Sequence, residues 1–262
     1  MVSRDADVRM DGVTLSDAQL GRYARHIVLR EVGGSGQARI VAGHVAVIGA
    51  GGIGSPAIQY LAAAGVGRLT LIDDDRVDQS NLQRQILFGT DDVGTPKVAG
   101  ARTAVTRINP DVAVEAIDRR IDAHNAAELL ADADVVIDGS DSFATRLAVA
   151  DAALELRIPL VSASVAQFEG QLAVYRGWRA GSPCYRCFVG NPLDAPEATC
   201  AEAGVLGAAA GVVGSLAAVE ALRALAPFGD DPDGRLLLID LLAMRFRSVA
   251  LPQDPGCTAC AA

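Results

Sequence analysis

The stretch HVAVIGAGGIGSPAIQYLAAAGVGRLTLIDDD, residues 44–75, decides the fold. It begins with an apolar strand at 44–48, continues through a glycine turn into a helical segment at 55–64, and ends with a second apolar strand at 68–72 that runs into three acids. This order of elements predicts the opening βαβ unit of a nucleotide-binding sheet.

Apolar segments of strand and helix length alternate through the first two thirds of the chain. We expect a helix over 15–32 with Ser16 as its cap, a second helix over 97–108 that stops before a proline, and a cysteine- and proline-rich loop over 181–202. Further strands are expected near 112–117, 135–137, 159–165, 171–175, 236–241 and 245–251. The pattern predicts an α/β fold, Rossmann-like and doubly wound, with a mainly parallel sheet that has helices on both faces and is extended by antiparallel strands. We interpret residues 1–14 as a disordered tail and residues 15–262 as a single domain.

Composition excludes several classes of function. The formal net charge is −9, which argues against nucleic-acid binding because such binding relies on Lys and Arg at phosphates. No apolar signal segment stands at the N-terminus, and the apolar run at 203–219 is short for a membrane span and is bracketed by Glu202 and Glu220. We therefore expect a cytoplasmic protein without a membrane partner, in which this run is a core helix.

The glycine turn is the first candidate site. A turn between a strand and a helix offers backbone N–H groups to a phosphate, and missing side chains let the phosphate approach. Asp73 ends the next strand, where a carboxylate can accept hydrogen bonds from a ribose. These features leave open a simple tight turn, an ATP site or an NAD-dependent dehydrogenase. The glycines in question are Gly49, Gly51, Gly52 and Gly54.

Polar motifs further along the chain favour ATP. Residues 81–85 read NLQRQ, Lys97 follows in GTPK, and GSDS at 139–142 comes directly after an apolar strand. Together they offer two cations, an amide and a carboxylate at the carboxyl edge of the sheet. Chemistry at the α-phosphate of ATP needs such groups, because cations neutralise phosphate charge and a carboxylate can hold Mg²⁺.

The ordered motifs resemble those of the MoeB/ThiF family, relatives of the E1 ubiquitin-activating enzymes. The resemblance runs from about Leu15 to Cys260. The motifs that carry it are RYARHIVL from Arg22, GAGGIGSP from Gly49, DDDRVDQSNLQRQ from Asp73, GTPK from Gly94, GSDS from Gly139, CYRC from Cys184, CAEAGVLG from Cys200 and CTAC from Cys257.

The resemblance implies a role for each matching residue. Asp73 would bind the ATP ribose, and Asp141 would position Mg²⁺. Arg25 would reach into the site of a partner subunit, so that a homodimer has two composite active sites. The residues expected at the nucleotide and its phosphates are Asn81, Arg84, Gln85 and Lys97. Two positions depart from the family pattern: His26 stands where Gln is usual, and Ser142 stands where Asn is usual.

The implied reaction is adenylylation of the C-terminal carboxylate of a small ubiquitin-like sulfur-carrier protein that ends in Gly-Gly. A separate protein, a cysteine desulfurase or a rhodanese, would supply the sulfur for molybdopterin, thiamine or related biosynthesis. Three alternatives remain: an E1-like enzyme that activates a peptide, an NAD-dependent dehydrogenase, and a binding protein with an inactive nucleotide site. The dehydrogenase does not account for Arg84 and Lys97, nor for the paired cysteines.

The cysteines divide into two CxxC pairs and a single residue. Two such pairs in a chain without an export signal favour a structural tetrahedral Zn²⁺ site over disulfides. The four expected ligands are Cys184, Cys187, Cys257 and Cys260. Cys200 is either a buried small side chain or, by its place in the family motif, a nucleophile that takes the activated carrier.

Overall fold

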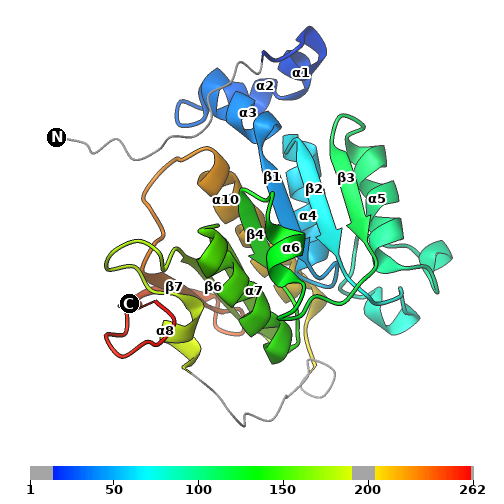
Figure 1. Ribbon diagram of the computed structural model, residues 1–262. Helices are drawn as coiled ribbons and strands as arrows, with labels where there is room; N and C mark the ends of the chain where they lie inside the picture. The colour runs from blue at the N-terminus through cyan, green and yellow to red at the C-terminus, as the bar shows by residue number, and fades with distance from the viewer. Residues whose placement is uncertain (1–13, 191–203, 261–262) are drawn as a thin grey trace.

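The computed structural model describes residues 14–190 and 204–260 of the chain. Its centre is one sheet with the strand order β3-β2-β1-β4-β5-β6-β7-β8 (Figure 1). The first five strands in this order pair in parallel, and the last three pair antiparallel, as predicted. The bounds are β1 His44–Ile48, β2 Arg68–Ile72, β3 Ala113–Ile117, β4 Val135–Asp138, β5 Leu160–Ala166, β6 Glu169–Tyr175, β7 Arg235–Asp240 and β8 Arg245–Ala250.

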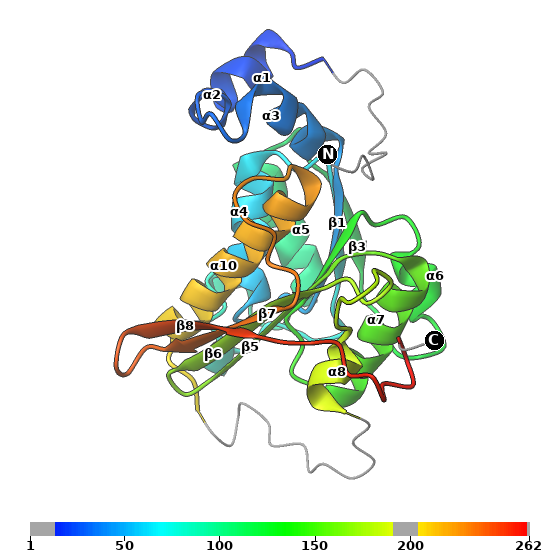
Figure 2. The same cartoon turned by 90° about the vertical axis from the view of Figure 1, so that its left-hand side faces the viewer.

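Helices cover both faces of the parallel part (Figure 2). One face carries α4 (Gly54–Ala64), α5 (Lys97–Ile108) and α10 (Gly207–Leu225), and the other carries α6 (Ala126–Leu130), α7 (Phe143–Leu156) and α8 (Tyr185–Val189). Two hydrophobic clusters fill the spaces between sheet and helices. Successive residues of β1 point into opposite clusters: Val45 and Val47 pack in the cluster on the α4 side, and Ala46 and Ile48 pack in the cluster on the α7 side.

The apolar run near the C-terminus is the core helix that the sequence predicts. By length and hydropathy, α10 could also span a membrane. It contacts α4, β4, β5 and β6, and it approaches the glycine turn closely. A Cβ atom on Gly214 would lie 2.2 Å from the carbonyl oxygen of Ile53, so only glycine permits this packing.

The N-terminal segment corrects one prediction. Residues 15–32 do not form a continuous helix but two short ones, α1 (Asp17–Arg22) and α2 (Ala24–Ile27). Tyr23 leaves the helical conformation between them because its ring is buried against Gly65. The capping role of Ser16 is confirmed, since its side chain accepts a hydrogen bond from the backbone of Gln19.

Three short helices were not predicted. α3 (Gly33–Ala42) is rich in glycine and has low intrinsic helix propensity, and burial of Gln37 and Ile40 overrides that propensity. The helices α6 and α8 have five residues each, too few for a periodic pattern. α8 lies within the segment that we expected to be a cysteine-rich loop. The helices α1–α3 lie beyond the amino ends of the parallel strands, at the top of Figure 1.

Candidate nucleotide site and cysteine cluster

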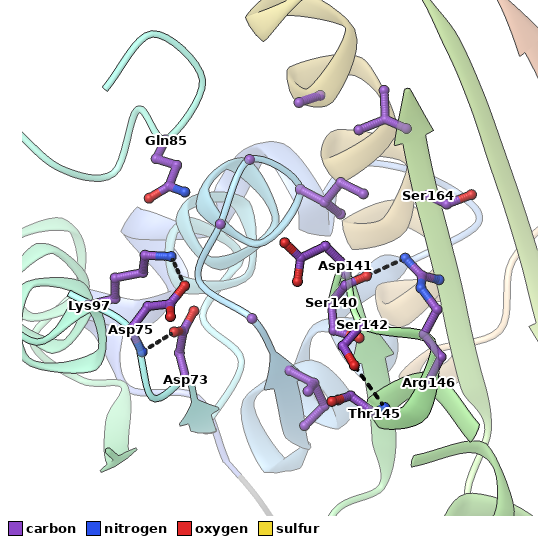
Figure 3. Close-up of a pocket in the computed structure, with 18 of the residues that line it drawn as sticks. Asp73, Asp75, Gln85, Lys97, Ser140, Asp141, Ser142, Thr145, Arg146 and Ser164 are labelled. Atoms are coloured by element: carbon purple, nitrogen blue, oxygen red, sulfur yellow. Dashed lines mark hydrogen bonds and ion pairs between the residues drawn. The ribbon is translucent and has the colours of Figure 1, made fainter. Parts of the chain in front are cut away.

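A cavity of about 410 Å³ opens at the carboxyl ends of the parallel strands. It lies where the strand order reverses between β1 and β4, which is the usual ligand position in open α/β sheets. One wall is the glycine turn that follows β1, and the facing wall is the loop 139–142 that follows β4 (Figure 3). The ends of β5 and β6 contribute Ser164 and Gln171 to the far side.

Two glycines shape the glycine turn, and a side chain at either position would strain the backbone. Gly49 has a φ of 85°, a left-handed conformation that favours glycine. A Cβ atom on Gly54 would lie 1.9 Å from the carbonyl oxygen of Gly49. Among the described residues, no side chain caps the N-terminus of α4, and the positive end of this helix dipole faces the cavity. The turn can accept an anion such as a phosphate.

Asp73 holds the glycine turn from the neighbouring strand. Its Oδ2 accepts a hydrogen bond from the backbone N–H of Ala50 at 2.7 Å, and its Oδ1 accepts one from Asp75 at 2.9 Å. Burial raises the pKa of this carboxyl above its ordinary value, and the nearby Lys97 ammonium opposes that rise. Each oxygen keeps a second lone pair, so Asp73 can still accept a hydroxyl hydrogen bond from a ligand.

The predicted cations lie on the same side of the cavity as Asp73. Lys97 is the first residue of α5 and is only 4% exposed, and its Nζ lies 2.7 Å from Oδ2 of Asp75. Arg84 lines the cavity, and its Nη2 donates to Oδ1 of Asn81 at 2.8 Å. Asn81 itself does not line the cavity, so in this structure it contacts Arg84 rather than the space for the ligand.

Gln85 is the cavity residue with an unsatisfied polar atom. Its side chain is 3% exposed and lines the cavity next to the glycine turn. Its Oε1 is buried and accepts no hydrogen bond from any residue that the structure describes. A buried acceptor without a donor costs free energy. The other polar atom of this amide, Nε2, lies beside the glycine turn, 3.7 Å from the position of a Cβ atom on Gly51, and can donate a hydrogen bond to a bound ligand.

The loop after β4 presents Asp141 to the cavity. Asp141 is exposed, faces the glycine turn across the cavity, and makes no hydrogen bond or ion pair with another described residue (Figure 3). Ser142 caps α7, with its hydroxyl accepting from Thr145 at 3.4 Å. Asn is an equally good cap, so the serine found here preserves this local structure.

Arg146 was missed by the sequence analysis. It is 9% exposed, and its Nη2 donates to the carbonyl oxygens of Ser140, in the loop after β4, and of Ala163, in the middle of β5. The guanidinium thereby ties the Asp141 loop to β5. Arg119 and Arg120 also line the cavity and were missed. Arg119 and Arg120 could have been predicted from the sequence, because they follow β3 directly and therefore lie at the carboxyl edge of the sheet. No sequence pattern indicates that Arg146 donates to carbonyl oxygens.

Arg25 is not among the residues that line this cavity. Arg25 is exposed on α2, at the opposite end of the parallel strands, and makes no hydrogen bond or ion pair with another described residue. His26 follows it, and its Nδ1 lies 3.0 Å from Oε1 of Gln37. Cys200 lies outside the residues that the structure describes.

The two CxxC pairs meet although 73 residues separate them. Three sulfur–sulfur distances are 3.8 Å for Cys184 to Cys187, 3.6 Å for Cys184 to Cys257 and 3.4 Å for Cys187 to Cys260. Four sulfurs around a tetrahedral Zn²⁺ at the usual Zn–S distance are about 3.8 Å apart. The four sulfurs all lie within 4.8 Å of one another and therefore fit such an ion.

The chain is similar in sequence and fold to several known proteins. The chain is 46% identical over 249 residues to the SAMP-activating enzyme E1 of Haloferax volcanii, covering 95% of this chain and 91% of that protein. It is 42% identical over 246 residues to the molybdopterin-synthase adenylyltransferase of Escherichia coli K12, covering 94% and 98%. The crystal structure of E. coli MccB with ATP shares the fold, with a TM-score of 0.79 at 22% identity over 92% of this chain and 75% of that one. Residues 23–259 match the ThiF family, and the chain therefore belongs to that family.

Proposed function

We propose that this protein is an adenylyltransferase that uses ATP to activate the C-terminal carboxylate of a small ubiquitin-like sulfur-carrier protein ending in Gly-Gly. One observation carries the proposal: Arg84, Lys97 and Asp141 converge on a glycine turn at the N-terminus of an uncapped helix. This arrangement supplies positive potential for a polyphosphate and a carboxylate for its metal ion. The names of similar proteins, a molybdopterin-synthase adenylyltransferase among them, support a sulfur-carrier substrate.

The residues suggest a reaction without a general base. An oxygen of the ionised carrier carboxylate attacks the α-phosphorus, the bond from that phosphorus to the bridging oxygen breaks, and pyrophosphate leaves. Lys97 and Arg84 stabilise the charge that develops on the phosphate oxygens, and Asp73 holds the nucleotide through a ribose hydroxyl. Asp141 would hold Mg²⁺, which neutralises phosphate charge when bound. Lys97 must turn from Asp75 towards the phosphate.

We further propose that Arg25 acts in the site of a second subunit. It lies beyond the C-terminal end of α4, whereas the cavity lies at the N-terminal end of the same helix. An 11-residue helix is about 16 Å long, which is too far for Arg25 to reach the cavity of its own chain. A homodimer with two composite sites would give this free cation a phosphate partner.

The four clustered cysteines would hold a structural Zn²⁺ ion. The ligand set leaves no open position, which is typical of a structural site. The bound ion would connect residues 257–260 to α8. Arg186, between the first two ligands, connects α8 in turn to α7: its Nε and Nη2 donate to Oδ1 and Oδ2 of Asp151 at 2.7 and 2.6 Å. The sulfur donor would be a separate protein, and Cys200 remains a candidate acceptor for the activated carrier.

The experiment that tests this function is ATP–pyrophosphate exchange on the purified protein with a panel of Gly-Gly-ending carriers. Exchange that needs one carrier and disappears in Lys97→Ala would support adenylylation and identify the pathway. ATP binding without exchange on any carrier would favour the alternative of a peptide acceptor. Binding of NAD in place of ATP would favour a dehydrogenase and overturn the proposal.

A further inference from the structure

Two buried amides join α2 to the end of α4 that is remote from the cavity. Tyr23, at the start of α2, is 3% exposed, and its hydroxyl accepts a hydrogen bond from Nδ2 of Asn109 at 2.8 Å. The same Nδ2 donates to the carbonyl oxygen of Ala62, near the end of α4, at 2.9 Å. Gly65 leaves the space for the ring, because a Cβ atom there would lie 2.2 Å from the Tyr23 hydroxyl oxygen.

The second amide makes a parallel connection. Nε2 of Gln37 donates to the carbonyl oxygen of Ala64 at 2.8 Å, so its Oε1 is left to accept. His26 Nδ1 lies 3.0 Å from this Oε1 and must therefore be the donor. This bond selects the tautomer of neutral His26 that carries its proton on Nδ1.

Both amides are fully buried, with Gln37 and Asn109 each 0% exposed. A buried amide is costly unless its donors and acceptor are paired, and these amides pair with the last carbonyls of α4 and with α2. The helix α2 has only four residues and cannot hold its own orientation in water. The two hydrogen bonds flank Arg25, whose own side chain is exposed.

We propose that Tyr23 and His26, held by Asn109 and Gln37, are positioning residues that aim Arg25 at the cavity of the partner subunit. The inference rests on the proposed function, because it assumes that Arg25 acts in trans. The two ends of α4 would then have different roles. Its first turn would bind the phosphates in the site of its own subunit, and its last carbonyl oxygens would hold, through Asn109 and Gln37, the segment that carries Arg25 for the other site.

A mixed dimer can distinguish positioning of Arg25 by Tyr23 and His26 from a general contribution of these residues to folding. One subunit carries Arg25→Ala and keeps Lys97, while the other carries Lys97→Ala and keeps Arg25. If Arg25 acts in trans, one of the two sites is complete, and the differently tagged, purified mixed dimer shows half of the wild-type pyrophosphate exchange. The variant Tyr23→Phe is then introduced into either subunit. Placement in the subunit that keeps Lys97 is the matched control for placement in the subunit that supplies Arg25.

We expect Tyr23→Phe to lower exchange roughly fivefold in the subunit that supplies Arg25, the effect of one lost hydrogen bond, and to have little effect in the other subunit. Because Asn109 keeps its bond to Ala62, the variant should fold. Equal losses in both placements would show that Tyr23 serves the fold or its own site, and would overturn the inference while leaving the proposed function intact. An inactive parent mixed dimer would overturn action in trans, and the inference with it.

His26 provides a second test on a more exposed side chain. His26→Leu removes the donor to Gln37 and should lower exchange only in the subunit that supplies Arg25. His26→Asn places an N–H donor at the same distance along the side chain and should restore most of the activity. A loss in His26→Asn as large as that in His26→Leu would contradict a positioning role through this hydrogen bond.

Discussion

Alanine is predicted to have different effects at two positions of the glycine turn: it should lower stability at one and weaken ATP binding at the other. In Gly54→Ala, the new Cβ would lie 1.9 Å from the carbonyl oxygen of Gly49 and 2.9 Å from its carbon. In Gly51→Ala, the nearest atom to the new Cβ is Nε2 of Gln85 at 3.7 Å, an ordinary contact. The first change therefore strains the backbone, whereas the second adds a methyl group to the wall of the cavity.

The geometry sets the size of the effect for Gly54→Ala. Ordinary contact begins at 3.4 Å, so the end of β1 and the start of α4 must separate by about 1.5 Å. The obstacle is backbone at the centre of the sheet rather than a flexible side chain, which places the cost at the upper end of the overpacking range, about 3 kcal/mol. For a chain of this size we expect the melting temperature to fall by about 6–12 °C.

Thermal melting and calorimetric titration with ATP measure the two effects separately. Gly51→Ala should melt within about 2 °C of the wild type, because open surface sites change stability by only a few tenths of a kcal/mol. It should bind ATP roughly tenfold more weakly or worse, the loss expected when one N–H bond to a charged group is blocked. A wild-type melting temperature for Gly54→Ala, or wild-type ATP affinity for Gly51→Ala, would refute the reasoning.

Three further predictions concern other parts of the molecule. Burial lowers the pKa of His44 below its ordinary 6.5, so the contribution of His44 to the free energy of unfolding is complete above that pH and is lost as the pH drops towards the folded-state pKa. Urea unfolding midpoints measured across this pH range should show the fall, and His44→Gln should reduce it. Removing metal by chelation should lower the melting temperature, with one Zn²⁺ per chain in the untreated protein and less in Cys260→Ser. Asn81→Ala should weaken ATP binding in the wild type and have no added effect in Arg84→Ala, because Asn81 contacts Arg84; additive losses in this double-mutant cycle would contradict that role.

The sequence predicts the elements around the cavity closely. The strands at 44–48 and 68–72 and the helix at 97–108 have the observed bounds, because continuous apolar runs and a helical period end at glycine, acid or proline. The helix predicted over 15–32 is broken at Tyr23, whose ring is buried against Gly65 and whose hydroxyl accepts a hydrogen bond from Asn109, 86 residues away. No local pattern records such a contact.

The same limit applies to the site. Glycines, cations and acids at the carboxyl edge of the sheet could be recognised from their order, and the structure brings Arg84, Lys97 and Asp141 to one cavity. The partner of each side chain could not be recognised. The packing of the fold decides that Lys97 pairs with Asp75 and that Arg146 donates to carbonyl oxygens of the loop after β4 and of β5.

The fold alone would not separate an adenylyltransferase from a dehydrogenase, because both place a nucleotide on a glycine turn after β1. The difference lies in the segment between β2 and α5. In a dinucleotide site the acid after β2 and the helix N-terminus bind the cofactor, and the reacting group lies far from the phosphates. Here residues 76–97 bring Arg84, Gln85 and Lys97 to the cavity beside the turn, which would place two cations at the phosphates of a bound nucleotide. A site arranged in this way stabilises a reaction at phosphorus, and the carboxylate that attacks needs no base to activate it.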